Sequence, residues 1–312
     1  LYRYGFTFDQ THILQEWLYR TKLREARLFV RDGKTFEIRS SFPGARGLED
    51  RTRPSALFLS VADQFNAPVA MEVVRAIADI GIISGLRDEP LFGTAVQTLE
   101  DPDMRRRTVS FVGALDTALE DLHVEAVDAD KALADAPEPI KALVRSTGLS
   151  RLYAMRTQHS VRDLEGRRVG QIEFDLKAQE SRGTERLVFL ASPVMQTIES
   201  GSTLVVDEFD ARLHPRLTTE IVHLFNSQVT NPRGAQLIVA THGVHLLARD
   251  TLRRDEVWFV QKDRLERTKL FSLAEFDTRK DDVFDRQYLL GRYGAVPVIS
   301  DLEEALRGTP ST

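Results

Sequence analysis

The stretch Thr203–Pro215, which reads TLVVDEFDARLHP, decides how the rest of the chain is interpreted. It opens with apolar and β-branched residues, and Asp207 and Glu208 follow them at once. This pattern predicts a short buried strand that delivers two carboxylates at its C-terminal end, the edge where open α/β sheets bind ligands. Adjacent carboxylates there suit nucleotide hydrolysis, with Asp207 holding Mg²⁺ through water and Glu208 polarising the attacking water. The alternative is that both acids merely open a solvated loop after a core strand.

The residues after this pair favour the nucleotide site. Phe209–Pro215 (FDARLHP) resembles the loop that follows the Walker B strand in ABC-type ATPases of the RecF, SMC and Rad50 kind. The resemblance implies an α/β fold, that of a P-loop NTPase head of ABC type, with ATP and Mg²⁺ as ligands. It also implies that Asp210 belongs to the D-loop, which faces a partner protomer. His214 is expected to be a buried capping or packing residue.

A second strand is predicted at Ala235–Ala240 (AQLIVA), and it ends in Thr241-His242-Gly243. This segment resembles the switch histidine of the same ATPases, which implies that His242 meets the γ-phosphate and the attacking water. An imidazole suits that position because it titrates near neutral pH. The alternative is an ordinary strand end. His242 and His245 also form an H-x-x-H pair of the kind that binds zinc, but the chain has no cysteine to complete such a site.

A third segment, Glu180–Glu185 (ESRGTE), precedes a predicted amphipathic helix. It resembles the divergent signature motif of the family. The resemblance implies that Ser181, Gly183 and Thr184, with the helix N-terminus, bind the γ-phosphate held by the other protomer. Without the resemblance, Ser181 is an ordinary N-cap with an acidic first turn behind it. The order of the segments is more specific than any one of them: signature, helix, Walker B, helix, strand and histidine.

One part of the pattern is missing from this chain. No G-x-x-x-x-G-K-[ST] occurs, although that loop supplies the backbone amides and the lysine that hold the phosphates. In the family this Walker A segment lies N-terminal to the features found here. We therefore expect the first βα unit to lie upstream or on another chain.

Composition narrows the class of protein. There are 42 basic and 47 acidic residues, so the net charge is −5 and gives no global attraction to nucleic acid or anionic membranes. No stretch approaches the roughly 18 apolar residues of a membrane span, and the N-terminus lacks a signal-peptide shape. The absence of cysteine excludes disulfides and fits the cytoplasm.

Three regions are expected along the chain. Residues 1–52 alternate like an antiparallel β-subdomain, with Tyr2, Tyr4, Phe6 and Phe8 on one face, read as core rather than as a base-stacking surface. Ser40–Arg53 is read as an exposed linker.

Residues 53–150 are expected to form a compact helical insertion, and residues 151–312 the ATPase core lobe. In the insertion, one helix is predicted from the spacing of Val112, Leu115, Leu119 and Leu122. The basic run Arg105–Arg107 is read as a solvated helix start.

The N-terminal aromatic stretch and the tail segment GRYGAVP (Gly291–Pro297) resemble RecF-like bacterial AAA family ATPases linked with phage defence. That resemblance implies a homodimer or higher oligomer formed through the ATP sites, and a separate effector such as a nuclease or toxin. A nuclease domain within this chain is not predicted. Asp281 and Asp282 lie in a polar stretch that does not suit metal binding, and no Asp-x-Asp pair follows the last strand. Two alternatives stay open: a RecF- or Rad50-like DNA-repair ATPase that binds DNA, and an ATP-gated scaffold with little turnover.

Overall fold

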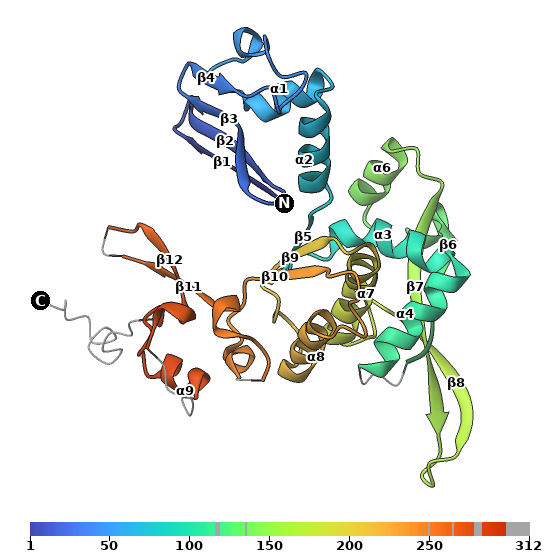
Figure 1. The fold of residues 1–312 in the computed structure, drawn as a ribbon. Helices are drawn as coiled ribbons and strands as arrows, with labels where there is room; N and C mark the ends of the chain where they lie inside the picture. The colour runs from blue at the N-terminus through green and yellow to red at the C-terminus, as the bar shows by residue number, and fades with distance from the viewer. Residues whose placement is uncertain (116–118, 135, 249, 264, 278–282, 298–312) are drawn as a thin grey trace, which may run out of the picture. The chain divides into compact units, whose positions relative to one another are not determined.

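The computed structural model is a mixed α/β protein, and it describes residues 1–115, 119–134, 136–248, 250–263, 265–277 and 283–297. The chain forms two compact units, Leu1–Gly81 and Ile82–Thr312 (Figure 1). The two units do not test the three functional regions expected from the sequence, and these regions stay a prediction. No described helix is long and apolar enough to cross a lipid bilayer.

The first unit is built on an antiparallel meander, as predicted. Its strands pair in the order in which they occur along the chain. A 3-10 turn at Glu49–Arg51 and two helices follow them. The elements are β1 (Tyr2–Phe8), β2 (Ile13–Thr21), β3 (Glu25–Asp32), β4 (Thr35–Ile38), α1 (Phe58–Gln64) and α2 (Pro68–Ala78).

The aromatic row of β1 is only partly in the core. Tyr2 and Tyr4 are half-buried against it, whereas Phe6 is 41% and Phe8 67% exposed. The expectation that the whole row is core is therefore wrong for its second half. Phe29, Phe42 and Phe58 form the centre of this core instead, with ring centroids 4.9 to 6.3 Å apart.

The segment Ser40–Arg53 is not the exposed linker that its composition indicated. Phe42, Ala45 and Leu48 are buried, and together they anchor the segment to the core of this unit. Gly44 and Gly47 have φ values of +79° and +84°, which let the chain turn between the anchors. These apolar residues are too few to form a periodic pattern in the sequence. The prediction of a linker therefore rested on the polar composition alone.

A buried pair of opposite charge fixes the segment that follows β4. Glu16 on β2 accepts hydrogen bonds from the backbone N–H groups of Phe58 (2.6 Å) and Leu59 (2.9 Å), and so caps α1 from a distance. Arg31 lies 3.8 Å from the Glu16 carboxylate and donates to the carbonyl oxygens of Ala56 and Pro54. Burial raises the pKa of Glu16, although its hydrogen bonds and Arg31 oppose the shift.

This raised pKa predicts a specific pH dependence. Because folding lifts the Glu16 pKa, the associated stability is fully present below the ordinary value of 4.5 and is lost as the pH rises through the folded-state pKa. We expect Glu16→Gln, which cannot ionise, to lack this loss. Urea unfolding of both proteins at several pH values from about 4 to 7 tests it. Parallel pH dependences for wild type and variant would contradict the expectation.

The second unit contains the strand predicted from TLVVD. β9 (Thr203–Asp207) pairs in parallel with β10 (Gln236–Val239), and β5 (Gly81–Ser84) lies on the other side of β9. The helices α7 (Arg182–Ser200) and α8 (Pro215–Asn226) pack against this sheet. Leu204 and Val206 of β9 are buried in the core they share, as expected for a central strand.

A second sheet in this unit is antiparallel, in the order β6-β7-β8. It corrects the sequence reading, because Leu119 and Leu122 belong to a strand, while the preceding helix ends at Ala114. The spacing of these leucines also fits a strand whose pairing shifts between Leu119 and Asp121, and both still reach the core. The elements are α3 (Glu89–Glu100), α4 (Pro102–Ala114), β6 (Leu119–Asp128), α5 (Ala129–Ala132), α6 (Glu138–Ser146), β7 (Arg151–Arg162) and β8 (Arg168–Asp175).

The C-terminal part folds around the hairpin of β11 (Trp258–Lys262) and β12 (Thr268–Ser272), followed by α9 (Phe284–Leu289). Phe259 stacks on Tyr288 and Tyr293 with ring centroids 5.4 and 5.7 Å away. Tyr293 is buried, and the Tyr288 hydroxyl donates to the carbonyl oxygen of Ala295. Both tyrosines therefore pack within the C-terminal part of the protein itself.

Candidate functional site

The parallel pairing of β9 and β10 brings the two predicted polar segments to one edge of the sheet (Figure 1). Asp207 ends β9, and Thr241–Gly243 follow β10 closely. The backbone N–H of Phe209 donates to the carbonyl oxygen of Ala240 (2.9 Å), so the two segments stay joined beyond the strands. Sequence reasoning correctly predicted both strands and the edge where they end.

The two residues predicted to be catalytic lie near each other. Glu208 Oε1 is 4.0 Å from His242 Nε2, and His242 is 88% exposed. This distance is longer than a hydrogen bond, so the two side chains are not hydrogen-bonded to each other. Glu208 adopts φ +51°, a left-handed conformation that turns the chain directly after the strand. Both groups are therefore available to solvent or to a ligand.

Asp207 is exposed and lightly engaged. In the part of the chain that the structure describes, its carboxylate accepts one hydrogen bond, from its neighbour's N–H (Glu208 N, 3.1 Å). Most of its acceptor positions thus face solvent. Such a carboxylate fits the hydrated magnesium ion that the sequence predicted, because Mg²⁺ keeps several waters when it binds.

Asp210 has a role within its own chain that the sequence did not suggest. Its Oδ1 accepts hydrogen bonds from Thr241 Oγ1 (2.6 Å) and from the backbone N–H of His242 (3.1 Å). Partial burial acts to raise the Asp210 pKa, but these hydrogen bonds prevail and lower it. The loop after β9 therefore holds the segment that carries the histidine.

The signature segment forms the N-terminus of α7. Ser181 is the N-cap, and its Oγ accepts from the backbone N–H of Thr184 (3.0 Å). A Cβ on Gly183 would lie 3.1 Å from the carbonyl oxygen of Arg212, so this glycine permits close contact with the loop after β9. The capping role read from the residues alone is confirmed, whereas binding to a nucleotide on another protomer stays a prediction.

Three charged residues at this site were missed in the sequence. Asp88, at the start of α3, lies 2.5 Å from Arg186 Nη1 and 3.0 Å from Arg212 Nη1. Arg186 belongs to α7 and is fully buried, while Arg212 lies in the loop after β9. The partners are distant in sequence, so local patterns could not reveal them. The one usable signal was an arginine inside the FDARLHP segment.

Gly85 is a second residue that the sequence reading overlooked. Its N–H donates to the carbonyl oxygen of Asp207 (2.6 Å), at the carboxyl end of β9. A Cβ at this position would lie 2.0 Å from the carbonyl oxygen of Glu208. Only glycine therefore fits between the end of β5 and the acidic pair.

Two other histidines near these segments, His214 and His245, make structural hydrogen bonds. His214 caps α8 by accepting from the backbone N–H of Arg216 (3.2 Å), although it is exposed rather than buried as expected. His245 pairs with Thr218 Oγ1 (2.7 Å), and burial lowers its pKa. Among the described residues no group of three metal-ligating side chains occurs. Asp281-Asp282 lies outside the described residues.

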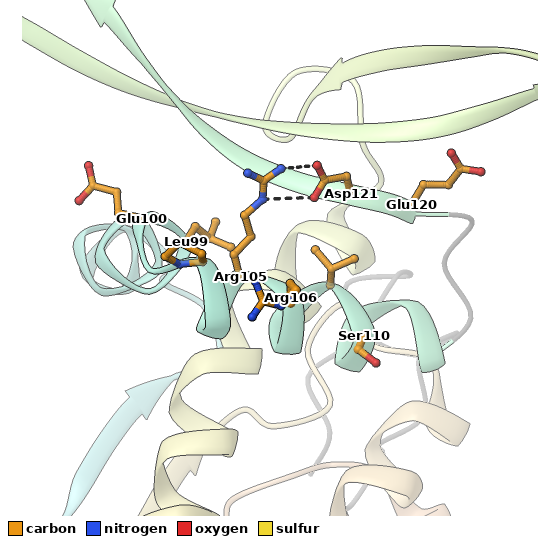
Figure 2. Close-up of a pocket in the computed structure, with 9 residues that line it drawn as sticks. Leu99, Glu100, Arg105, Arg106, Ser110, Glu120 and Asp121 are labelled. Atoms are coloured by element: carbon orange, nitrogen blue, oxygen red, sulfur yellow. Dashed lines mark hydrogen bonds and ion pairs between the residues drawn. The ribbon is translucent and has the colours of Figure 1, made fainter.

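A surface hollow of about 600 Å³ lies apart from these groups, between α4 and β6 (Figure 2). Arg105 is paired with Asp121 across it, and Arg106 and Arg107 pair with Asp103 and Glu199. Each arginine of the basic run thus pairs with a carboxylate of the protein. This agrees with the prediction of a solvated helix start. This hollow contains none of the predicted site residues.

Comparison with known families agrees with the geometry. A family model described as "AAA domain, putative AbiEii toxin, Type IV TA system" matches residues 1–248. A search among curated proteins gave no match. Because the family match covers most of the chain, including the acidic strand end and the histidine segment, the chain belongs to this AAA-domain family of nucleotide-binding P-loop ATPases.

Proposed function

We propose that this chain provides the hydrolytic lobe of an ABC-type ATPase head. The observation that carries the proposal is the juxtaposition of Asp207, Glu208 and His242 at one sheet edge, with Glu208 Oε1 and His242 Nε2 4.0 Å apart. At this separation one water molecule beside the pair could hydrogen-bond to both the carboxylate and the imidazole.

Each residue has a distinct role in this proposal. Asp207 holds the hydrated Mg²⁺ that accompanies ATP, because its carboxylate is exposed and mostly free of protein partners. Glu208 accepts a hydrogen bond from the attacking water and orients it. His242, exposed and near Glu208, donates to the terminal phosphate where negative charge must be stabilised. Mg²⁺ supplies charge neutralisation at the phosphates when it is bound.

The phosphate-binding loop is proposed to be supplied at the free edge of β10. Within the described residues β10 pairs only with β9, and Ile238 on it is 55% exposed. Parallel strands normally lie inside a sheet and are covered on both sides. A strand added here parallel to β10 would carry its following loop to the same edge as Asp207 and His242. We therefore place the missing βα unit at this position, whether it lies upstream or on another chain.

A second copy of the head is proposed to complete the site. Ser181, Gly183 and Thr184 sit at the N-terminus of a long helix, whose free N–H groups favour phosphate. In the proposed dimer these groups meet the nucleotide held by Asp207 and Glu208 of the opposite head. Asp210 approaches the same interface from the loop after β9.

The biological role is proposed to be regulatory. The description of the matching family names a putative toxin of a toxin–antitoxin system, which supports a role in defence. We propose in addition that the head acts together with a separate effector protein. In that role ATP binding and hydrolysis would switch the head dimer, and the effector would produce the damage. Turnover that rises strongly on addition of DNA would instead favour the repair type of ATPase.

The proposal is tested by measuring ATP hydrolysis on the full-length protein, with its intact mass determined in the same preparation. We expect hydrolysis that requires Mg²⁺ and is abolished by a chelator. If the preparation contains the phosphate-binding loop and yet neither binds nor hydrolyses ATP, the proposal is wrong. If the loop is on another polypeptide, activity should appear only when the two are combined.

A further inference from the structure

One buried carboxylate ties together two elements that the proposed function presents to the partner head. Asp88 Oδ1 lies 2.5 Å from Arg186 Nη1 on the signature helix, and its Oδ2 lies 3.0 Å from Arg212 Nη1. Arg212 follows Asp210 closely in the loop after β9. The Asp88 side chain is itself only 7% exposed.

The two elements also meet directly through the backbone. The carbonyl oxygen of Arg212 lies where a Cβ on Gly183 would be only 3.1 Å away. Arg212 adopts φ +64°, a conformation that is uncommon for a residue with a side chain. Because such a conformation needs support from its surroundings, the ion pair to Asp88 helps to hold the loop against the signature segment.

The two arginines that pair with Asp88 differ in how far they are exposed to solvent. Arg186 is fully buried, and its Nε and Nη2 have no hydrogen-bond partner among the described residues. Asp88 is therefore the group that neutralises it, and an uncompensated charge there would be costly. Arg212 is 40% exposed and can be solvated if its partner is removed. The exposed arginine is thus the member that can be changed with least harm to folding.

We propose that Asp88 is a positioning residue that fixes the signature segment and the Asp210 loop to each other, so that both meet the partner's nucleotide in one geometry. This inference rests on the proposed function. Asp88 itself contacts neither nucleotide, and it acts through Arg186 and Arg212. Loosening the link would leave each head able to bind ATP but unable to complete the opposite site.

The test uses Arg212→Gln in the protein that hydrolyses ATP. We expect kcat to fall at least about tenfold, with KM for ATP little changed, because small displacements at a reacting centre are costly. Arg212→Lys, which keeps the charge, should recover part of the rate. Arg105→Gln is the matched control. Arg105 on α4 is similarly exposed and also forms an ion pair with a carboxylate of the same chain, that of Asp121. Its kcat should remain that of wild type.

Mixing variants distinguishes positioning across the dimer from damage within one head. Arg212→Gln mixed with Glu208→Gln should regain about a quarter of the wild-type turnover, because half of the dimers contain one site with both sides intact. Glu208→Gln mixed with His242→Ala should regain none, since both residues belong to the same side of each site. Ser181→Ala mixed with Glu208→Gln examines the shared site itself and should also recover.

The outcomes separate the inference from the function on which it rests. If Ser181→Ala complements Glu208→Gln but Arg212→Gln does not, the shared site stands and the inference about Asp88 is overturned. A wild-type kcat in Arg212→Gln overturns it as well. If no pair complements, although the wild-type protein hydrolyses ATP, the two-headed site is wrong. Asp88→Asn serves as a second variant, and it should show the same kcat loss at temperatures where it remains folded.

Discussion

Glu208→Gln should bind ATP like the wild-type protein and lose about three orders of magnitude in kcat, because a water-orienting base contributes on that scale. The amide keeps the size of the side chain but cannot accept the proton or hold the water as strongly. Folding should be preserved, since the substitution leaves the backbone contacts of Glu208 in place and its partly exposed side chain lies 4.0 Å from His242 without a hydrogen bond to it. Equilibrium binding of a fluorescent ATP analogue and steady-state phosphate release measure the two properties separately.

The control for this substitution is Glu165→Gln, which alters an exposed carboxylate at the turn between β7 and β8. It should leave both binding and turnover unchanged. Wild-type turnover in Glu208→Gln would remove the basis for the assigned catalytic pair. Loss of ATP binding together with turnover would indicate a structural role for Glu208 in place of a chemical one.

Gly85→Ala should destabilise the second unit by about 1–3 kcal/mol and also reduce ATP hydrolysis. The added Cβ would lie 2.0 Å from the carbonyl oxygen of Glu208 and 2.5 Å from that of Asp207. Both obstacles are backbone atoms, so no side chain can rotate away. The strand end that carries the acidic pair must shift, and the geometry of Glu208 shifts with it.

Gly93→Ala is the matched comparison, because Gly93 lies in α3 and a Cβ there meets nothing within 4 Å. Replacing an exposed helical glycine should stabilise the protein by about 0.5–1 kcal/mol. Urea midpoints of the two variants should therefore move in opposite directions. A Gly85→Ala protein with unchanged midpoint and turnover would show that β5 and β9 can separate easily, against the contacts described.

The parts of the fold that could be predicted depend on patterns among residues close together in the sequence. β9 could be predicted because an apolar run is followed immediately by acids, and α7 because its apolar residues recur at helical spacing behind a serine cap. The meander of the first unit followed from alternation. In each case neighbouring residues contain the information, and the tertiary structure did not override it.

The parts that failed depend on contacts between distant residues. Leu119 and Leu122 satisfied a helical spacing, yet pairing with β7 makes them a strand, because a ladder of hydrogen bonds outweighs a weak local preference. Asp88 meets Arg186 and Arg212 only after folding, so its role could not be read from its neighbours. The same holds for Gly85, whose reason for being glycine is the backbone of another strand.

The buried pair of Glu16 and Arg31 has a consequence for how the first unit can evolve. Glu16 is fully buried and Arg31 is 2% exposed, and each supports a different piece of backbone beyond β4. Loss of either one leaves the other as a charge in the interior, at a cost of about 3–5 kcal/mol. A lineage can therefore abandon this arrangement only by changing both positions nearly together, so among relatives the two should vary as a unit.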